Sequence, residues 1–185
     1  MNHLEIEYKT LLDKDEYQSL LPLFTDTELV VQTNHYIDIP DQLIRQEKMA
    51  LRVRTFTNQA ELTLKVPETV GHFEYNQNLS QEETKAILQN KEFPDGEIKN
   101  LLDSKGIPVE QLVVWGSLTT ERFEKETAAG LVALDHSLYL DTEDYELEIE
   151  VETAEQEENF HQFIKEHGIV YKAAKNKIAR LAERL

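Results

Sequence analysis

The 185-residue sequence contains no cysteine, and glycine (6 residues), proline (5) and tryptophan (1) are also scarce. Without cysteine the chain has no disulfide bond, thiolate metal site or thiol nucleophile, so histidine, aspartate and glutamate remain as the strong metal ligands. With 40% hydrophobic residues and few glycines and prolines, the composition is that of a globular chain. We expect a single folded domain, residues 1–185, in the cytoplasm.

Positive charges and long hydrophobic runs are also scarce. Lys and Arg number 19 against 36 Asp and Glu, a net charge of -17, which disfavours non-specific binding to nucleic acid or to an anionic membrane. The N-terminus lacks the layout of a signal peptide, and no apolar run approaches the ~18 residues that span a bilayer. We therefore expect a soluble monomer or homodimer with no nucleic-acid or membrane partner. An anionic small molecule would bind only where the few cations gather.

Charged and apolar residues alternate at the start of the chain. A strand there places Glu5, Glu7 and Lys9 on one face, because side chains repeat with a period of two. On a solvated strand this pattern is only the polar side of a half-buried sheet. On an enclosed face, two carboxylates beside an ammonium form a divalent-cation site next to an anion site.

The same alternation recurs with cations in a predicted hairpin of strands 49–56 and 61–66. Arg52 and Arg54 share one face of the first strand, and Lys65 lies on a polar face of the second. Arginine offers a planar fork and lysine a mobile point charge, a combination suited to several phosphate oxygens. The alternative is a pair of exposed amphipathic strands.

A third alternating stretch, 144–151, carries only acids on its polar face. Glu146, Glu148 and Glu150 lie on one side, and the other side is apolar. Three like charges along one strand repel each other, so this face is better tolerated when cations lie opposite it.

The rest of the chain supplies further strands and the helices. Polar periodicity places Glu74, Arg122 and Asp135 on the charged faces of three more strands. Strands are predicted at 27–39, 71–76 and 112–124 and after Gly130, with a loop at 41–48. Helices are predicted at 13–24, 80–89, 95–104 and 152–167, and the basic tail 172–185 has helical spacing.

The faces of these strands complement one another. The carboxylates are Glu5, Glu7, Glu74, Asp135, Glu146, Glu148 and Glu150, and the cations are Lys9, Arg52, Arg54, Lys65 and Arg122. About five amphipathic helices need an apolar surface to cover, and the outside of a closed barrel supplies one. The fold class is therefore predicted to be α+β, a closed antiparallel β-barrel with a charged interior and amphipathic helices outside. Such a lumen must hold water, ions or a ligand, and its charges suit a polyphosphate bridged by Mg²⁺ or Mn²⁺.

The ordered set of motifs resembles the CYTH domains, also called triphosphate tunnel metalloenzymes. It consists of Glu5-x-Glu7-x-Lys9, Leu51-Arg52-x-Arg54, Leu62-x-Leu64-Lys65, Arg122 and Tyr145-Glu146-x-Glu148-x-Glu150. The resemblance implies an eight-stranded tunnel that binds triphosphate. One departure is Thr120, where many family members carry a basic residue two positions before the middle-strand arginine.

The resemblance also implies roles for individual residues. Phosphates would be held by Lys9, Arg52, Arg54, Lys65, Arg122 and a C-terminal lysine, either Lys175 or Lys177, with Lys177 the better match. Metal would be held by Glu5, Glu7, Glu146, Glu148 and Glu150, supported by Glu74 and Asp135.

These roles predict a metal-dependent hydrolase that cleaves a phosphoanhydride bond of inorganic triphosphate or of a small organic triphosphate. Lys9 would neutralise developing charge, and Glu148 or Glu150 would orient the attacking water. The alternatives are a non-catalytic sensor module that binds polyphosphate or nucleotide, and an adenylate cyclase. The number of carboxylates favours the hydrolase, since phosphate binding alone does not need so many acids.

Overall fold

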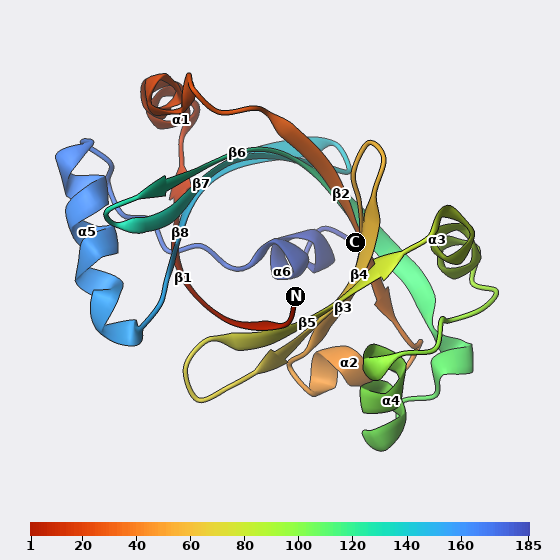
Figure 1. The fold of residues 1–185 in the computed structure, drawn as a ribbon. Helices are drawn as coiled ribbons and strands as arrows, with labels where there is room; N and C mark the ends of the chain where they lie inside the picture. Colours follow the sequence, from red (N-terminus) through yellow and green to blue (C-terminus); the bar gives the residue numbers. More distant parts are fainter.

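Eight strands close into one antiparallel barrel in the computed structural model, which describes residues 1–185. Their order around the barrel is β1-β5-β4-β3-β2-β6-β7-β8. Figure 1 looks down the barrel. The strands are β1 (His3–Leu12), β2 (Val30–Asp38), β3 (Ala50–Thr55), β4 (Ala60–Pro67), β5 (His72–Leu79), β6 (Val113–Thr127), β7 (Gly130–Tyr139) and β8 (Thr142–Val151). The predicted α+β class and closed eight-stranded barrel are confirmed.

The hydrophobic core lies between the barrel wall and two groups of helices, on opposite sides of the barrel in Figure 1. On one side, Leu51 and Leu62 of the wall belong to a cluster with Ile98 of a covering helix. On the other side, Leu147 of β8 belongs to a cluster with Phe160. The helices are α1 (Lys14–Leu20), α2 (Leu43–Gln46), α3 (Gln81–Leu88), α4 (Glu97–Ser104), α5 (Glu157–Glu166) and α6 (Lys177–Ala182). Packing the apolar faces outward leaves the polar faces of the strands to line the lumen.

The helix starts agree with their predicted caps, but one predicted loop was wrong. Asp13 and Ser80 both form capping boxes, each with the glutamate three residues later. The predicted loop 41–48 contains the short helix α2. The buried carboxylate of Asp38 stabilises it by accepting hydrogen bonds from the backbone N–H groups of Ile39, Ile44 and Arg45. A one-turn helix held by a preceding side chain leaves no periodicity in its own sequence.

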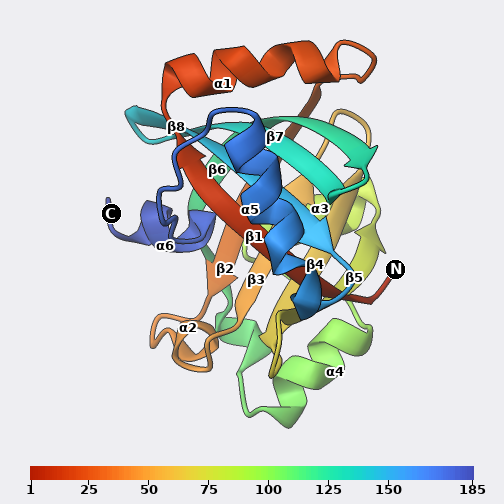
Figure 2. The ribbon, with the colours of Figure 1, turned by 90° about the vertical axis from the view of Figure 1, so that its left-hand side faces the viewer.

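The C-terminal helix α6 lies across one end of the barrel, and the N-terminus lies at the other end (Figures 1 and 2). Leu181 of α6 is fully buried in a cluster with Tyr36, Leu118 and Tyr139. A Cβ atom on Gly116 would lie 3.0 Å from the Leu181 side chain, so this glycine makes room for the helix. The helix therefore closes one mouth of the barrel and leaves the opposite mouth, where β1 begins, without such a plug. None of the helices is long and apolar enough to cross a bilayer.

Candidate functional site

Strand pairing brings the predicted charged residues together inside the barrel. Lys9 pairs in register with Glu148, and Arg122 with Asp135. On the other side of the barrel, Lys65 is the register partner of a buried glutamate, Glu74. Because neighbouring strands direct paired residues to the same face, the cations and carboxylates predicted from separate strands meet in one lumen.

The innermost cluster is built around the Lys177 ammonium, which projects from α6. Its Nζ lies 2.8 Å from Asp135, 2.8 Å from Glu146 and 2.6 Å from Glu148. Arg122 adds a bidentate pair to Asp135, at 2.8 and 2.7 Å, and a third hydrogen bond to Glu148 at 2.8 Å. The side chains of Asp135 and Glu146 are fully enclosed. This cluster joins α6 to β6, β7 and β8.

The two glutamates of this cluster differ in acidity. Burial and the neighbouring Glu148 carboxylate raise the pKa of Glu146 to about 7. Burial alone would also raise the pKa of Glu148, but Lys177 and Arg122 hold it well below the usual range. Oxygen atoms of Asp135, Glu146 and Glu148 lie within 4.8 Å of one another. The Lys177 ammonium lies against all three of these carboxylates, of which Glu146 and Glu148 were predicted as metal ligands and Asp135 as a supporting residue.

The two C-terminal lysines lie in different places. The Lys177 side chain is 11% exposed in the lumen, whereas that of Lys175 is 65% exposed and pairs with Glu183 outside it. Lys175 is therefore not brought to the predicted phosphate site. Arg180 of α6 also reaches the lumen and pairs with Glu146 and Asp144, a contact that the sequence patterns did not predict. Its spacing of three residues from Lys177 was the available signal, since i and i+3 share a helix face.

A second group in the lumen has an excess of positive charge. Arg54 donates a hydrogen bond from Nε to Asn34 at 2.9 Å, and its nearest carboxylate, Glu61, is 3.8 Å away. Arg52 lies 3.8 Å from Glu74, and its buried Nε has no hydrogen-bond partner. Burial, together with the cations Arg52 and Arg122, lowers the pKa of Arg54 to about 10. These arginines have donors available for an anion.

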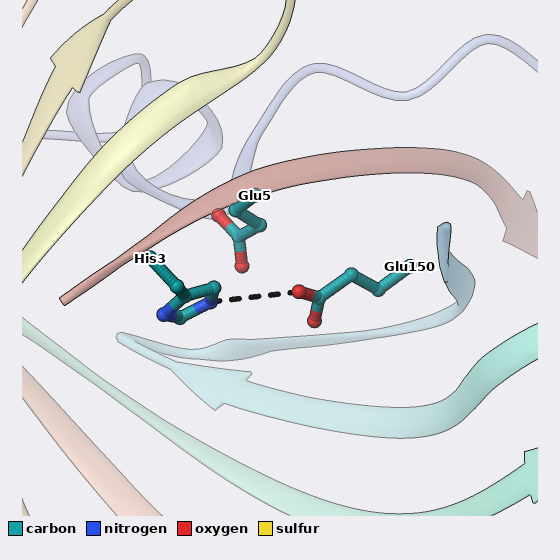
Figure 3. Close-up of side chains that lie close together, drawn as sticks. All are labelled: His3, Glu5 and Glu150. Atoms are coloured by element: carbon teal, nitrogen blue, oxygen red, sulfur yellow. Dashed lines mark ion pairs between the residues drawn. The ribbon is translucent and has the colours of Figure 1, made fainter. Parts of the chain in front are cut away.

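A third group, at the open mouth, has an excess of negative charge (Figure 3). Glu5 from β1 and Glu150 from β8 lie beside His3, and one ligand atom from each falls within 4.8 Å of the others. Glu7 is the register partner of Glu150 and pairs with Lys9 at 2.8 Å. Burial, with the carboxylates of Glu5, Glu7 and Glu74, raises the pKa of Glu150 to about 7. His3 was not among the predicted residues, although it is in phase with Glu5.

Between these groups the lumen is lined by buried neutral polar side chains. Thr120 faces Ser137, with their hydroxyl oxygens 3.2 Å apart, and Thr63 donates to Asn76 at 2.8 Å. Thr120 thus provides a hydroxyl at the position where many CYTH domains carry a basic residue, two positions before Arg122. The lumen can place hydrogen-bond donors and acceptors along a bound chain of phosphates, with separate groups of cations and carboxylates around it.

Comparison with known proteins agrees with this geometry. The model of the CYTH domain matches residues 3–182. The Bacillus subtilis protein named "Putative triphosphatase YjbK" is 37% identical over 183 residues, which cover 97% of this chain and 95% of that protein. A crystal structure from Bacillus halodurans, described as a "putative adenylate cyclase", is 36% identical with a TM-score of 0.91 and 97% coverage of both chains. HpAC1 from Hippeastrum, named as an adenylyl cyclase and described as having a dominant triphosphatase activity, has the same fold at 22% identity. Its TM-score is 0.83, with coverage of 98% of this chain and 96% of that one.

Proposed function

Because the chain belongs to the CYTH domain family, we propose that it binds a triphosphate in the barrel lumen and hydrolyses one phosphoanhydride bond with the help of a divalent metal ion. The substrate is inorganic triphosphate or a small organic triphosphate. Residues 1–185 act as one tunnel domain in this proposal. The name of the Bacillus subtilis relative supports this activity, and the charges of the lumen support the position of the substrate.

The observation that carries the proposal is that one lumen holds a group of cations and a separate group of carboxylates, each with too few partners of opposite charge. Arg52 and Arg54 have too few carboxylate partners, and burial beside other cations lowers the pKa of Arg54. Glu150 has too few cationic partners, and burial beside other carboxylates raises its pKa. A metal-bound triphosphate offers the opposite charge to each group, with phosphate oxygens toward the arginines and the metal toward the glutamates.

The residues at the open mouth fit a divalent ion. The Oε2 atoms of Glu5 and Glu74 are buried without a hydrogen bond of good geometry, although both pair with the Lys65 ammonium, and the Glu150 carboxylate lies close to Glu5. Carboxylate oxygens are the ligands that Mg²⁺ and Mn²⁺ prefer. Glu5, Glu7 and Glu150 would therefore hold the metal, whereas Glu146 and Glu148 are occupied by Lys177. When bound, the ion would polarise phosphate oxygens and lower the pKa of bound water.

The protein's own side chains then have distinct tasks. Arg52, Arg54 and Lys65 bind the non-bridging oxygens and neutralise the charge that develops as the P–O bond breaks. Lys9 is placed between the carboxylates of β1 and β8 and stabilises the leaving phosphate. Glu150, with 31% of its side chain exposed, has room to orient a water molecule. Glu148 instead holds Lys177 and Arg122 in position.

The test is phosphate release from inorganic triphosphate, ATP and thiamine triphosphate, each with Mg²⁺, Mn²⁺ or a chelator. We expect metal-dependent release that falls by about 100-fold or more in Glu150→Gln, as for loss of a group that positions the nucleophile. The matched control is Glu152→Gln, which changes an exposed glutamate two residues further on. Tight triphosphate binding without release would overturn the hydrolase and identify a sensor module. Pyrophosphate and cyclic nucleotide from ATP would identify a cyclase.

A further inference from the structure

His3 lies at the open mouth of the lumen and points toward the carboxylates of Glu5 and Glu150 (Figure 3). Its Nε2 is 3.5 Å from Glu150 Oε1. The His3 side chain is 42% exposed and that of Glu150 is 31% exposed, so an ion from solvent can reach both. His3 and Glu150 come from neighbouring strands, β1 and β8; the β1/β8 ladder begins at Ile6 and pairs Glu150 with Glu7, and His3 lies on β1 just before it.

The other ring nitrogen of His3 indicates what Nε2 can do. Nδ1 lies 3.4 Å from the carbonyl oxygen of Met1. A carbonyl oxygen only accepts hydrogen bonds, so this contact favours the neutral tautomer with the proton on Nδ1, which leaves a lone pair on Nε2. Two acceptors, Nε2 and Glu150 Oε1, then face each other and require a proton or a metal ion between them. Metal-binding histidines adopt this arrangement, with the second nitrogen bonded to a carbonyl or carboxylate.

The surroundings of His3 also favour a cation. Glu74 is its register partner on β5, and the Glu74 side chain is only 9% exposed. Its buried Oε2 has no hydrogen-bond partner, and its nearest cations, Lys65 and Arg52, are 3.7 and 3.8 Å away. With Glu5 and Glu150 this makes three carboxylates beside one imidazole. Lys65 pairs with Glu5 as well as with Glu74, so Glu150 is the one of these three carboxylates that has no lysine or arginine partner. Its charge is the one that a divalent ion would balance.

We propose that His3, Glu5 and Glu150 form a metal site in which the imidazole nitrogen selects Mn²⁺ over Mg²⁺. Imidazole nitrogen binds first-row transition metals, whereas Mg²⁺ prefers oxygen ligands and retains its waters. The inference rests on the metal requirement of the proposed function and extends it to the choice of metal. It assigns His3 as a metal ligand and gives it no part in proton transfer.

The test is metal binding by untagged, full-length protein at pH 7.5 without substrate. Electron paramagnetic resonance of free Mn²⁺ and calorimetry with Mg²⁺ would give both affinities for the wild type and for His3→Gln. We expect Mn²⁺ affinity to fall by about 10- to 100-fold and Mg²⁺ affinity to change by less than about threefold. The control is His161→Gln, because His161 has the same 42% exposure and the same 3.5 Å distance to a carboxylate, on the outer helix α5.

A second readout is the NMR signal of the His3 ring, identified by its loss in His3→Gln. Sub-stoichiometric Mn²⁺ should broaden it, and the His161 signal should stay sharp. Equal Mn²⁺ affinity in wild type and His3→Gln, or an unbroadened His3 signal, would overturn the inference even where triphosphate hydrolysis is intact. Mn²⁺ binding that depends on His3, without hydrolysis of any triphosphate, would support the metal site and refute the proposed hydrolase.

Discussion

Removing the Lys177 side chain should destabilise the fold strongly, because this residue holds the innermost acidic cluster together. Its side chain is 11% exposed, and its ammonium lies 2.6 to 2.8 Å from the carboxylates of Asp135, Glu146 and Glu148. Lys177→Met would keep the length of the side chain and leave these buried acids with fewer cations. Loss of one partner of a buried ion pair typically costs about 3–5 kcal/mol, since the remaining charge is neither paired nor hydrated.

The cost should be at the lower end of that range and should depend on pH. Arg122 and Arg180 still contact the cluster in the variant, and Glu146 can take up a proton. The pKa of Glu146 is about 7 in the folded protein, above its ordinary value of 4.5. A group with a raised folded pKa favours folding at low pH, and this contribution is lost as the pH rises through the folded pKa. Losing Lys177 raises that pKa further, so we expect a cost of about 3 kcal/mol at pH 8 and a smaller cost at pH 5.5.

Urea unfolding at the two pH values measures this difference. The control is Lys175→Met in the same segment, where the side chain is 65% exposed and the expected change is within about 0.5 kcal/mol. If Lys177→Met cost no more than Lys175→Met at pH 8, or cost more at pH 5.5 than at pH 8, the assignment of Lys177 as the cation of the buried cluster would be wrong.

Two further predictions concern the outer surface of the barrel. Burial opposes a charge on His136, but hydrogen bonds from both ring nitrogens to Glu121 and Glu143 raise its pKa above 6.5. The charged ring therefore stabilises the fold below about pH 6.5 and loses this effect as the pH rises through the raised pKa, so the stability gap to His136→Gln should shrink between pH 6 and pH 9. A constant gap in urea unfolding would contradict this. Asp38→Ala should lower the free energy of unfolding by about 2–3 kcal/mol, because three backbone N–H groups lose a charged acceptor. Asp41→Ala on the exposed side of the same loop should change it little, and equal losses would refute the capping role.

The inward direction of the charged residues could be predicted because it depends only on side-chain alternation. Glu5, Arg52 and Glu148 face the lumen whichever residue begins or ends each strand, and the apolar residues between them face the helices. Strand boundaries were less certain: β2 begins at Val30 rather than at residue 27, but this shift changes no side-chain direction. The barrel therefore follows from a pattern that is present within each strand.

Features that depend on contacts between distant segments could not be predicted in the same way. Helical spacing in the tail indicated α6, but it did not indicate that Leu181 would close the mouth of the barrel. It also left Lys175 and Lys177 as alternatives, because only the position of the helix start at Lys177 decides which lysine enters the lumen. His3 was in phase with Glu5 but became visible as part of a site only when β8 placed Glu150 beside it.

The most direct test of the account is the affinity of the ligand-free protein for inorganic triphosphate, measured by calorimetry with all divalent metal chelated. Arg54→Gln should weaken binding by about 10- to 100-fold through the loss of a charge-assisted hydrogen bond, while Arg45→Gln on the exposed surface of α2 should bind as the wild type does. Urea unfolding of the variant checks that its fold is intact, because Arg54 also donates a hydrogen bond to the buried Asn34. Equal affinity of Arg54→Gln and wild type would show that triphosphate does not bind at these arginines, and the lumen would no longer be the site.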